Sequence, residues 1–192
     1  MLRIQNPMSE LKLFMILLGC KPPGRHVEQH DFFFGIASSL KDLVPEIEAF
    51  WPEAPSIHLD GWREVTVVED HEINIRLKSE NISQESPKLF FINLGGYTKN
   101  KFEEQHYVLL TVKDNKADAF NTAKQTLFFK NNHFEAASTH IDDKYGIDVD
   151  DLYEIEELLT SSQKDTYQIE LLHSSGQEED PVYLGYFKLS SL

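Results

Sequence analysis

An internal repeat constrains the fold of this chain more than any other feature of its sequence. Residues 88–106 align with residues 12–30 at a constant offset, without a gap. Nine of the nineteen aligned positions are identical, where ordinary residue usage would give about one. Three groups carry most of the identity: Lys-Leu-Phe at 12–14 and 88–90, Gly19 with Gly95, and Glu-Gln-His at 28–30 and 104–106. A repeat of this kind indicates one supersecondary unit that is used twice.

The first copy has the pattern of a strand–strand–helix–strand unit. A continuous apolar run ends before Gly19 and predicts a buried strand, and an aromatic run after His30 predicts a second one. Apolar residues at helical spacing, with Ser38 or Ser39 as the N-cap and Pro52 after the end, predict a helix. The expected elements are strands at 11–18, 29–37 and 56–60, a helix at 40–50, and a hairpin of 63–68 with 72–77.

The second copy follows the same order. We expect strands at 88–94, 106–113 and 136–142, and a helix at 116–128 that Asn115 caps. His140-Ile141-Asp142 then repeats His58-Leu59-Asp60 after an insertion of six residues. The acidic segment 148–159 fits either a helix or a strand. The end of the chain, 166–173 and 182–189, predicts a closing hairpin.

These elements predict an α+β fold with two internal repeats of a β-β-α-β unit and appended β-hairpins. The expected divisions are a leader at 1–10, a first repeat at 11–78, a linker at 79–87 and a second repeat at 88–192 that includes the C-terminal hairpin. A unit this small cannot cover both faces of its own sheet. We therefore expect the copies to pack as one globular unit, in a pseudo-two-fold arrangement.

The charge balance limits the classes of partner. The chain has 18 basic and 32 acidic side chains, and its formal net charge is −14. Nucleic acids and anionic membranes both require a basic surface, so we expect neither as a partner. No apolar run approaches the ~20 residues of a membrane span. Cys20 is the single cysteine, which excludes an internal disulfide and suits a reducing cytoplasm.

Two short motifs that pair histidine with a carboxylate are the candidates for chemistry. Residues two apart in a strand share a face, so each histidine lies beside the acid of its own motif. Imidazole with carboxylate can bind a divalent metal ion or act as an acid/base pair. The candidate catalytic residues are His30, His106, Glu28 and Glu104, and the candidate metal ligands are His30, His58, Asp60, His106, His140 and Asp142.

A purely structural role remains open for the same residues. His30 shares its predicted face with Phe32, Phe34 and Ile36, and a glutamate beside it would satisfy a half-buried imidazole. Known metal-site motifs do not match the sequence elsewhere. Asp148-Val149-Asp150 begins like a calcium-binding loop, but its sixth position is Tyr153 where the loop requires glycine.

The sequence resembles a bacterial family known as domain of unknown function 1543. The resemblance covers nearly the whole chain and implies soluble bacterial proteins that often hold two copies of the domain. The family implies no activity and no catalytic residue. The matching strings are 12–14, 19, 22–24, 28–31, 50–52 and 58–62 in the first copy, and 93–97, 105–107, 140–146 and 184–189 in the second.

Two function classes are compatible with these patterns. The first is a non-enzymatic binding module, cytoplasmic and acidic, which acts on a protein or small molecule through a surface or a cleft between the copies. The second is a small-molecule or metal-dependent enzyme that uses the repeated Glu-Gln-His and His-x-Asp residues, with a divalent metal as a possible cofactor. A homodimer formed through an exposed strand edge is compatible with either class.

Overall fold

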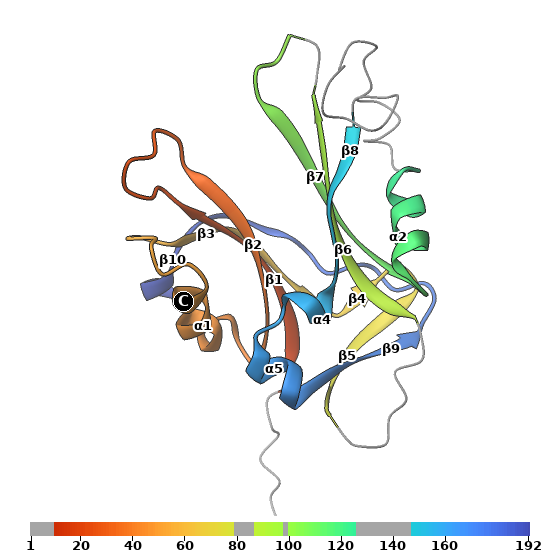
Figure 1. The fold of residues 1–192 in the computed structure, drawn as a ribbon. Coiled ribbons are helices and arrows are strands. Elements are labelled where there is room, and N and C mark those ends of the chain that lie inside the picture. The colour runs from red at the N-terminus through yellow and green to blue at the C-terminus, as the bar shows by residue number, and fades with distance from the viewer. Residues whose placement is uncertain (1–9, 79–86, 98–99, 126–146) are drawn as a thin grey trace, which may run out of the picture. The chain divides into compact units, whose positions relative to one another are not determined.

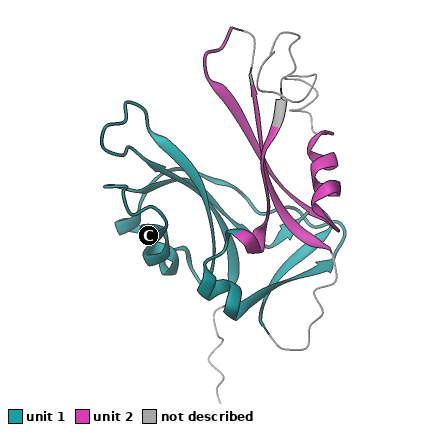
Figure 2. Cartoon of the chain, viewed as in Figure 1, with its two compact units in different colours: residues 1–80, 158–192 teal, residues 81–157 magenta. Residues whose placement is uncertain are grey.

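The computed structural model describes residues 10–78, 87–97, 100–125 and 147–192. The chain divides into two compact units, shown in Figure 2. Unit 1 consists of residues 1–80 and 158–192, and unit 2 of residues 81–157. Each unit is built around antiparallel strands with few helices, so the predicted α+β class is confirmed.

The main sheet of unit 1 has the strand order β10-β3-β1-β2, and all its pairings are antiparallel (Figure 1). Its strands are β1 (Lys12–Cys20), β2 (Gln29–Ala37), β3 (His58–Val65) and β10 (Tyr183–Lys188). The predicted strands at 11–18, 29–37 and 56–60 are confirmed, and β3 is longer than expected. β1 lies in the middle of the sheet because its apolar run can be buried on both faces.

Alternate residues of β1 form the core beneath the helical segment η1 (Leu40–Leu43) and α1 (Val44–Phe50). The fully buried members of this core are Ile16, Leu18, Ile47 and Leu59. The helical segment matches the predicted range, and its N-cap is Ser39, one of the two predicted residues. Ser39 is the N-cap without a capping bond from its side chain, because its hydroxyl donates to Asp42 Oδ2 instead (2.7 Å).

A second sheet of unit 1 has the order β4-β5-β9. It consists of β4 (Val67–Val68), β5 (His71–Leu77) and β9 (Tyr167–His173), which follows α5 (Ser161–Thr166). The predicted C-terminal hairpin is wrong, because β9 pairs with β5 and β10 pairs with β3. The last strands complete edges of unit 1, and 158–192 thus belongs with the first copy. The short turn η2 (Leu189–Ser191) ends the chain.

Unit 2 contains one sheet of order β7-β6-β8 and the helix α2. Its elements are β6 (Lys88–Tyr97), β7 (Glu104–Lys113), α2 (Lys116–Ala123), β8 (Ile147–Glu154) and the short α4 (Ile155–Leu158). The predicted cap of α2 is confirmed, since Asp118 N donates to Asn115 Oδ1 (3.0 Å). The open assignment of 148–159 resolves into a strand followed by a helical turn. The strand expected at 136–142 lies outside the described residues.

None of the helices among the described residues is both long enough and apolar enough to cross a membrane.

One carboxylate in the loop before β10 accepts three hydrogen bonds from Thr66 and Val67. Thr66 N and Val67 N both donate to Asp180 Oδ2 (2.7 and 3.1 Å), and Thr66 Oγ1 donates to Oδ1 (2.6 Å). We predict that Asp180→Ala lowers the free energy of unfolding by about 1–3 kcal/mol, because it leaves these donors without their charged acceptor. Chemical denaturation measures the change. Glu178→Ala, an exposed residue of the same loop, is the control, and equal stability of the two variants would contradict the prediction.

Burial makes the stability of unit 1 depend on pH through Glu46. Burial raises the pKa of the Glu46 carboxyl, although the hydrogen bond from Gln163 Nε2 (2.8 Å) opposes the rise. The folded state therefore holds this proton more tightly than the unfolded state. The stability that the protonated Glu46 carboxyl contributes is fully present below its pKa in the unfolded state. This contribution is lost as pH rises through its pKa in the folded state.

Replacing Glu46 by glutamine removes this ionisation. We predict that Glu46→Gln raises the melting temperature at pH 7.5 and that the gain shrinks as pH falls towards about 4. Thermal melts across this pH range provide the test, with Glu48→Gln, an exposed residue of the same helix, as the control. An increase in melting temperature that grows towards low pH would contradict the direction of the Glu46 pKa shift.

Candidate metal centre

A row of residues across three strands places the first candidate site. Gly19 of β1 pairs with His30 of β2 on one side and with His58 of β3 on the other. Directly paired residues share a face of the sheet, so both imidazoles stand on the face of Gly19, opposite the core of Ile16 and Leu18. The two predicted motifs meet because β1 lies between the strands that carry them.

The aspartate of β3 lies beside this row, at a β-bulge. Leu17 pairs with Gly61 and Leu18 with Leu59, which leaves Asp60 as the extra residue. Because Asp60 lies two residues after His58, it is on the same face of the sheet. Asp60 Oδ2 accordingly lies next to the place where a Cβ on Gly19 would be, at 2.5 Å. His58 Nε2 lies 2.6 Å from the same point, so only glycine leaves room for both groups.

Four side chains form the unit 1 cluster: Glu28, His30, His58 and Asp60. Each carboxylate faces both imidazoles. The Nε2 of His30 lies 3.0 Å from Asp60 Oδ2 and 3.8 Å from Glu28 Oε2. The Nε2 of His58 lies 3.2 Å from Asp60 Oδ1 and 3.2 Å from Glu28 Oε1. Donor atoms of Glu28, His30 and Asp60 are close enough together to hold one metal ion.

The contact between His30 and Asp60 is not a hydrogen bond. Asp60 Oδ2 is buried and receives no hydrogen bond, although His30 Nε2 is only 3.0 Å away. Donor atoms on a metal with bonds of about 2.1 Å lie about 3.0 Å apart in octahedral and about 3.4 Å apart in tetrahedral geometry. A buried carboxylate oxygen without a donor is costly, and a cation between the two groups would satisfy it.

The cluster is closed on one side and open on the other. The side chain of His58 is only 6% exposed, and the ring of Tyr186 lies over it at a centroid distance of 4.2 Å. The side chains of His30 and Glu28 are 46% and 42% exposed. An ion bound here would therefore be reachable from solvent, as in catalytic metal sites that keep one position open.

Unit 2 contains a second cluster built on the same plan. Gly95 of β6 pairs with His106 of β7 and with Asp148 of β8. Asp150 is the extra residue of the bulge in β8, because Asn93 pairs with Asp151 and Leu94 with Val149. Its carboxylate lies against the place where a Cβ on Gly95 would be.

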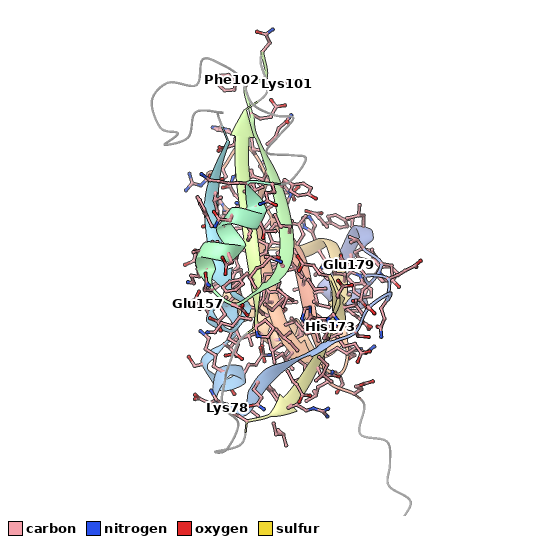
Figure 3. The ribbon with its side chains drawn as sticks, turned by 90° about the vertical axis from the view of Figure 1, so that its right-hand side faces the viewer. Lys78, Lys101, Phe102, Glu157, His173 and Glu179 are labelled. Carbon is pink, nitrogen blue, oxygen red and sulfur yellow. The ribbon has the colours of Figure 1, made fainter. Side chains whose placement is uncertain are left out.

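The unit 2 cluster consists of Glu104, His106 and Asp150. His106 Nδ1 lies 3.4 Å from Asp150 Oδ2, and His106 Nε2 lies 3.9 Å from Glu104 Oε2. These three residues also offer donor atoms close enough together for one ion. The loop that leads into Glu104 carries Lys101 and Phe102 at its tip, as Figure 3 shows, and Phe102 is fully exposed.

The structure thus joins most of the residues that the sequence singled out. Glu28, His30, His58 and Asp60 converge in unit 1, and Glu104 and His106 come together in unit 2. His140 and Asp142 lie outside the described residues.

Asp150 is the functional candidate that the sequence patterns did not reveal. The strand register gives it the place in unit 2 that Asp60 holds in unit 1, the place assigned to Asp142 from sequence. The available signal was the match of Ile147-Asp148-Val149-Asp150 to Ile57-His58-Leu59-Asp60, which keeps the apolar alternation and the final aspartate.

Residues 25–75 match the family model described as Domain of Unknown Function (DUF1543). The resemblance to this family is therefore confirmed over these residues, which include the whole unit 1 cluster. No curated protein matches the chain. Neither finding supplies an activity.

The fold is similar to that of a solved structure, the crystal structure of a protein Il1583 from Idiomarina loihiensis. The TM-score is 0.61 at 20% sequence identity, and the match covers 94% of this chain and 98% of that chain. At this identity the likeness establishes the fold alone.

The cluster geometry makes a prediction for Gly19. We expect Gly19→Ala to push Asp60 and His58 apart, because the new methyl group would overlap both side chains. The imidazole NMR signals of His58 and His30 should move. Gly24→Ala is the control: its φ of +76° makes alanine strained there, but no atom lies within 4 Å of the new Cβ. Unchanged imidazole signals in folded Gly19→Ala would contradict this geometry.

Proposed function

We propose that this protein binds a divalent transition-metal ion in unit 1, through His30, His58, Asp60 and Glu28. Imidazole nitrogens with carboxylate oxygens suit zinc, iron, nickel and copper. The observation that carries the proposal is Asp60 Oδ2, a buried oxygen that lies 3.0 Å from an imidazole nitrogen and receives no hydrogen bond. The spacing of the donor atoms, close to that around a metal ion, supports it.

The competing explanation is a structural network in which the histidines donate hydrogen bonds to the acids. In such a network His30 would aim its N–H at the oxygen beside it, and Asp60 Oδ2 would be satisfied. The structure instead leaves that oxygen without a donor. The glycine beneath the cluster also favours a ligand site, since it allows two polar groups to approach each other over bare backbone.

The two classes predicted from sequence meet in this proposal. For a binding module, the metal ion would be the bound ligand. For an enzyme, the exposed side chains of His30 and Glu28 leave one side of the ion open to a further oxygen ligand. We therefore propose a solvent-accessible metal centre, and we assign no reaction to it. The proposal includes a cytoplasmic bacterial setting, as the single buried cysteine suggests, and two copies of one repeated unit.

Metal analysis tests the proposal. We expect untagged protein purified without chelator to contain transition metal, measured by elemental mass spectrometry. After stripping with EDTA, zinc should bind again in isothermal titration calorimetry. His30→Ala and Asp60→Asn should each weaken zinc binding at unit 1 at least about tenfold; the background variant His106→Ala removes unit 2 binding from the measurement.

The matched control is His26→Ala, which removes an exposed histidine close to the cluster in sequence. It should bind zinc like its parent. If stripped protein takes up no transition metal, or if folded His30→Ala binds zinc as tightly as the His26→Ala control, the proposal is wrong.

A further inference from the structure

The unit 1 cluster belongs to one row of residues across the sheet, and a second, apolar row runs beside it. Both rows cross β2, β1, β3 and β10 on the face that carries Gly19, because directly paired residues share a face. The rows are two residues apart on β1, which is about 7 Å. The first row consists of His30, Gly19, His58 and Lys188, and the second of Phe32, Leu17, Gly61 and Leu184.

The apolar row is partly open to solvent. Leu17 and Phe32 are half-buried, and Leu184 is 76% exposed. Gly61 has no side chain, and Leu184 Cδ2 lies 3.0 Å from the place where a Cβ on Gly61 would be. Leu184 therefore covers the backbone of β3 next to the cluster. Exposed apolar groups that gather in one place are typical of a binding surface.

Tyr186 connects the apolar row to the cluster. Its ring lies against the ring of His58, with centroids 4.2 Å apart and planes inclined by 30°. The residue is nevertheless 65% exposed, so much of the ring faces solvent. The register of β10 shifts between Leu184 and Phe187, and Tyr186 lies in this irregular stretch. An aromatic ring in this position can stack on a flat apolar group of a ligand.

The charges around the cluster favour a ligand with one negative charge. The two positive charges of a divalent ion would balance the carboxylates of Glu28 and Asp60. Lys188 adds a further positive charge on the same face, because it pairs directly with His58. Among the residues that the structure describes, no carboxylate forms an ion pair with the Lys188 amine. A carboxylate would supply both an oxygen for the open side of the ion and the charge that Lys188 attracts.

We infer that the metal centre of unit 1 takes a small monocarboxylate with an apolar, ring-bearing body as its further ligand. The carboxylate binds the ion and is attracted by Lys188, and the body lies over Leu184 and Tyr186. The inference rests on the proposed function, because the ion holds the carboxylate. It adds the chemical class of the ligand, which the metal-binding residues alone do not determine.

Two acids with the same head and different bodies test the inference. Phenylacetate and acetate are titrated by calorimetry into zinc-loaded protein that carries His106→Ala, which limits zinc binding to unit 1. We expect phenylacetate to bind at least about tenfold more tightly than acetate, because its ring leaves water against Leu184 and Tyr186. Phenylacetamide has the same ring without the charge, and it should bind at least about tenfold more weakly than phenylacetate.

Two tyrosines of β10 provide a variant and its matched control, both made in the His106→Ala background. Tyr186→Ala should lower the ratio of phenylacetate affinity to acetate affinity at least about threefold. Tyr183 is also exposed, but its ring stacks on Trp62 at 4.4 Å, and Trp62 packs against the core on the other face. Tyr183→Ala should therefore leave the ratio unchanged. Lys188→Gln should weaken both acids by a similar factor, about threefold. Circular dichroism verifies that each variant is folded.

The outcomes separate this inference from the proposed function. If zinc-loaded protein binds phenylacetate no more tightly than acetate or phenylacetamide, the inference is wrong, while zinc binding keeps the proposed function. The inference is also wrong if folded Tyr186→Ala keeps the ratio of the Tyr183→Ala control, or if zinc-free protein binds phenylacetate equally well. Absence of zinc binding by the His106→Ala protein overturns the proposed function itself, and the inference with it.

Discussion

The candidate site depends on a glycine, a residue without a Cβ, in the middle of a sheet. Gly19 lies on the central strand β1, between the strands that carry His30 and His58. Adjacent strands are about 4.8 Å apart, so side chains on the two outer strands are normally separated by the side chain between them. Without a Cβ at Gly19, the imidazole of His58 and the carboxylate of Asp60 occupy that space. The same construction over Gly95 in unit 2 indicates that this is a feature of the fold and not a local accident.

The aspartates at the two β-bulges complete the clusters for which the glycines leave room. Regular alternation already places Asp60 on the face of His58 and, across the sheet, of Gly19, because Asp60 lies two residues after His58. The bulge in β3 leaves Asp60 without a paired residue on β1, and the bulge in β8 leaves Asp150 without a paired residue on β6. The acids therefore stand beside imidazole nitrogens in both units. A bulge weakens the strand pairing locally, so its presence at both aspartates fits a function that needs their carboxylates in place.

Local patterns in the sequence predicted the elements well, and long-range pairing accounts for the errors. The apolar run of β1, the aromatic run of β2 and the cap at Asn115 are local signals, and they were sufficient. The pairs Glu28 with His30 and His58 with Asp60 also followed from the order of residues. That the two pairs meet depends on β1 lying between β2 and β3, which strand patterns do not specify. The C-terminal hairpin was wrong for the same reason, since β9 and β10 join strands about a hundred residues earlier.

The missed aspartate has a related cause. Alignment by the histidine favoured His140 with Asp142, whereas the described pairing follows the apolar alternation of Ile147 and Val149. A bulge has no distinctive residue pattern, so the sequence did not show that Asp150 would be the extra residue of β8. The exchange of histidine for aspartate opposite the glycine then hid the equivalence of the two strands. Repeats are thus better aligned by the strand pattern than by the residues of a site that has diverged.

The most direct test of the metal centre in unit 1 is a crystal structure of the zinc-soaked protein with anomalous data collected at the zinc absorption edge. We predict an anomalous peak at about 2.1 Å from His30 Nε2 and from an oxygen of Asp60. A structure without a peak between these residues, in which His30 donates a hydrogen bond to Asp60 Oδ2, would show that the cluster is a structural network and would contradict a metal centre.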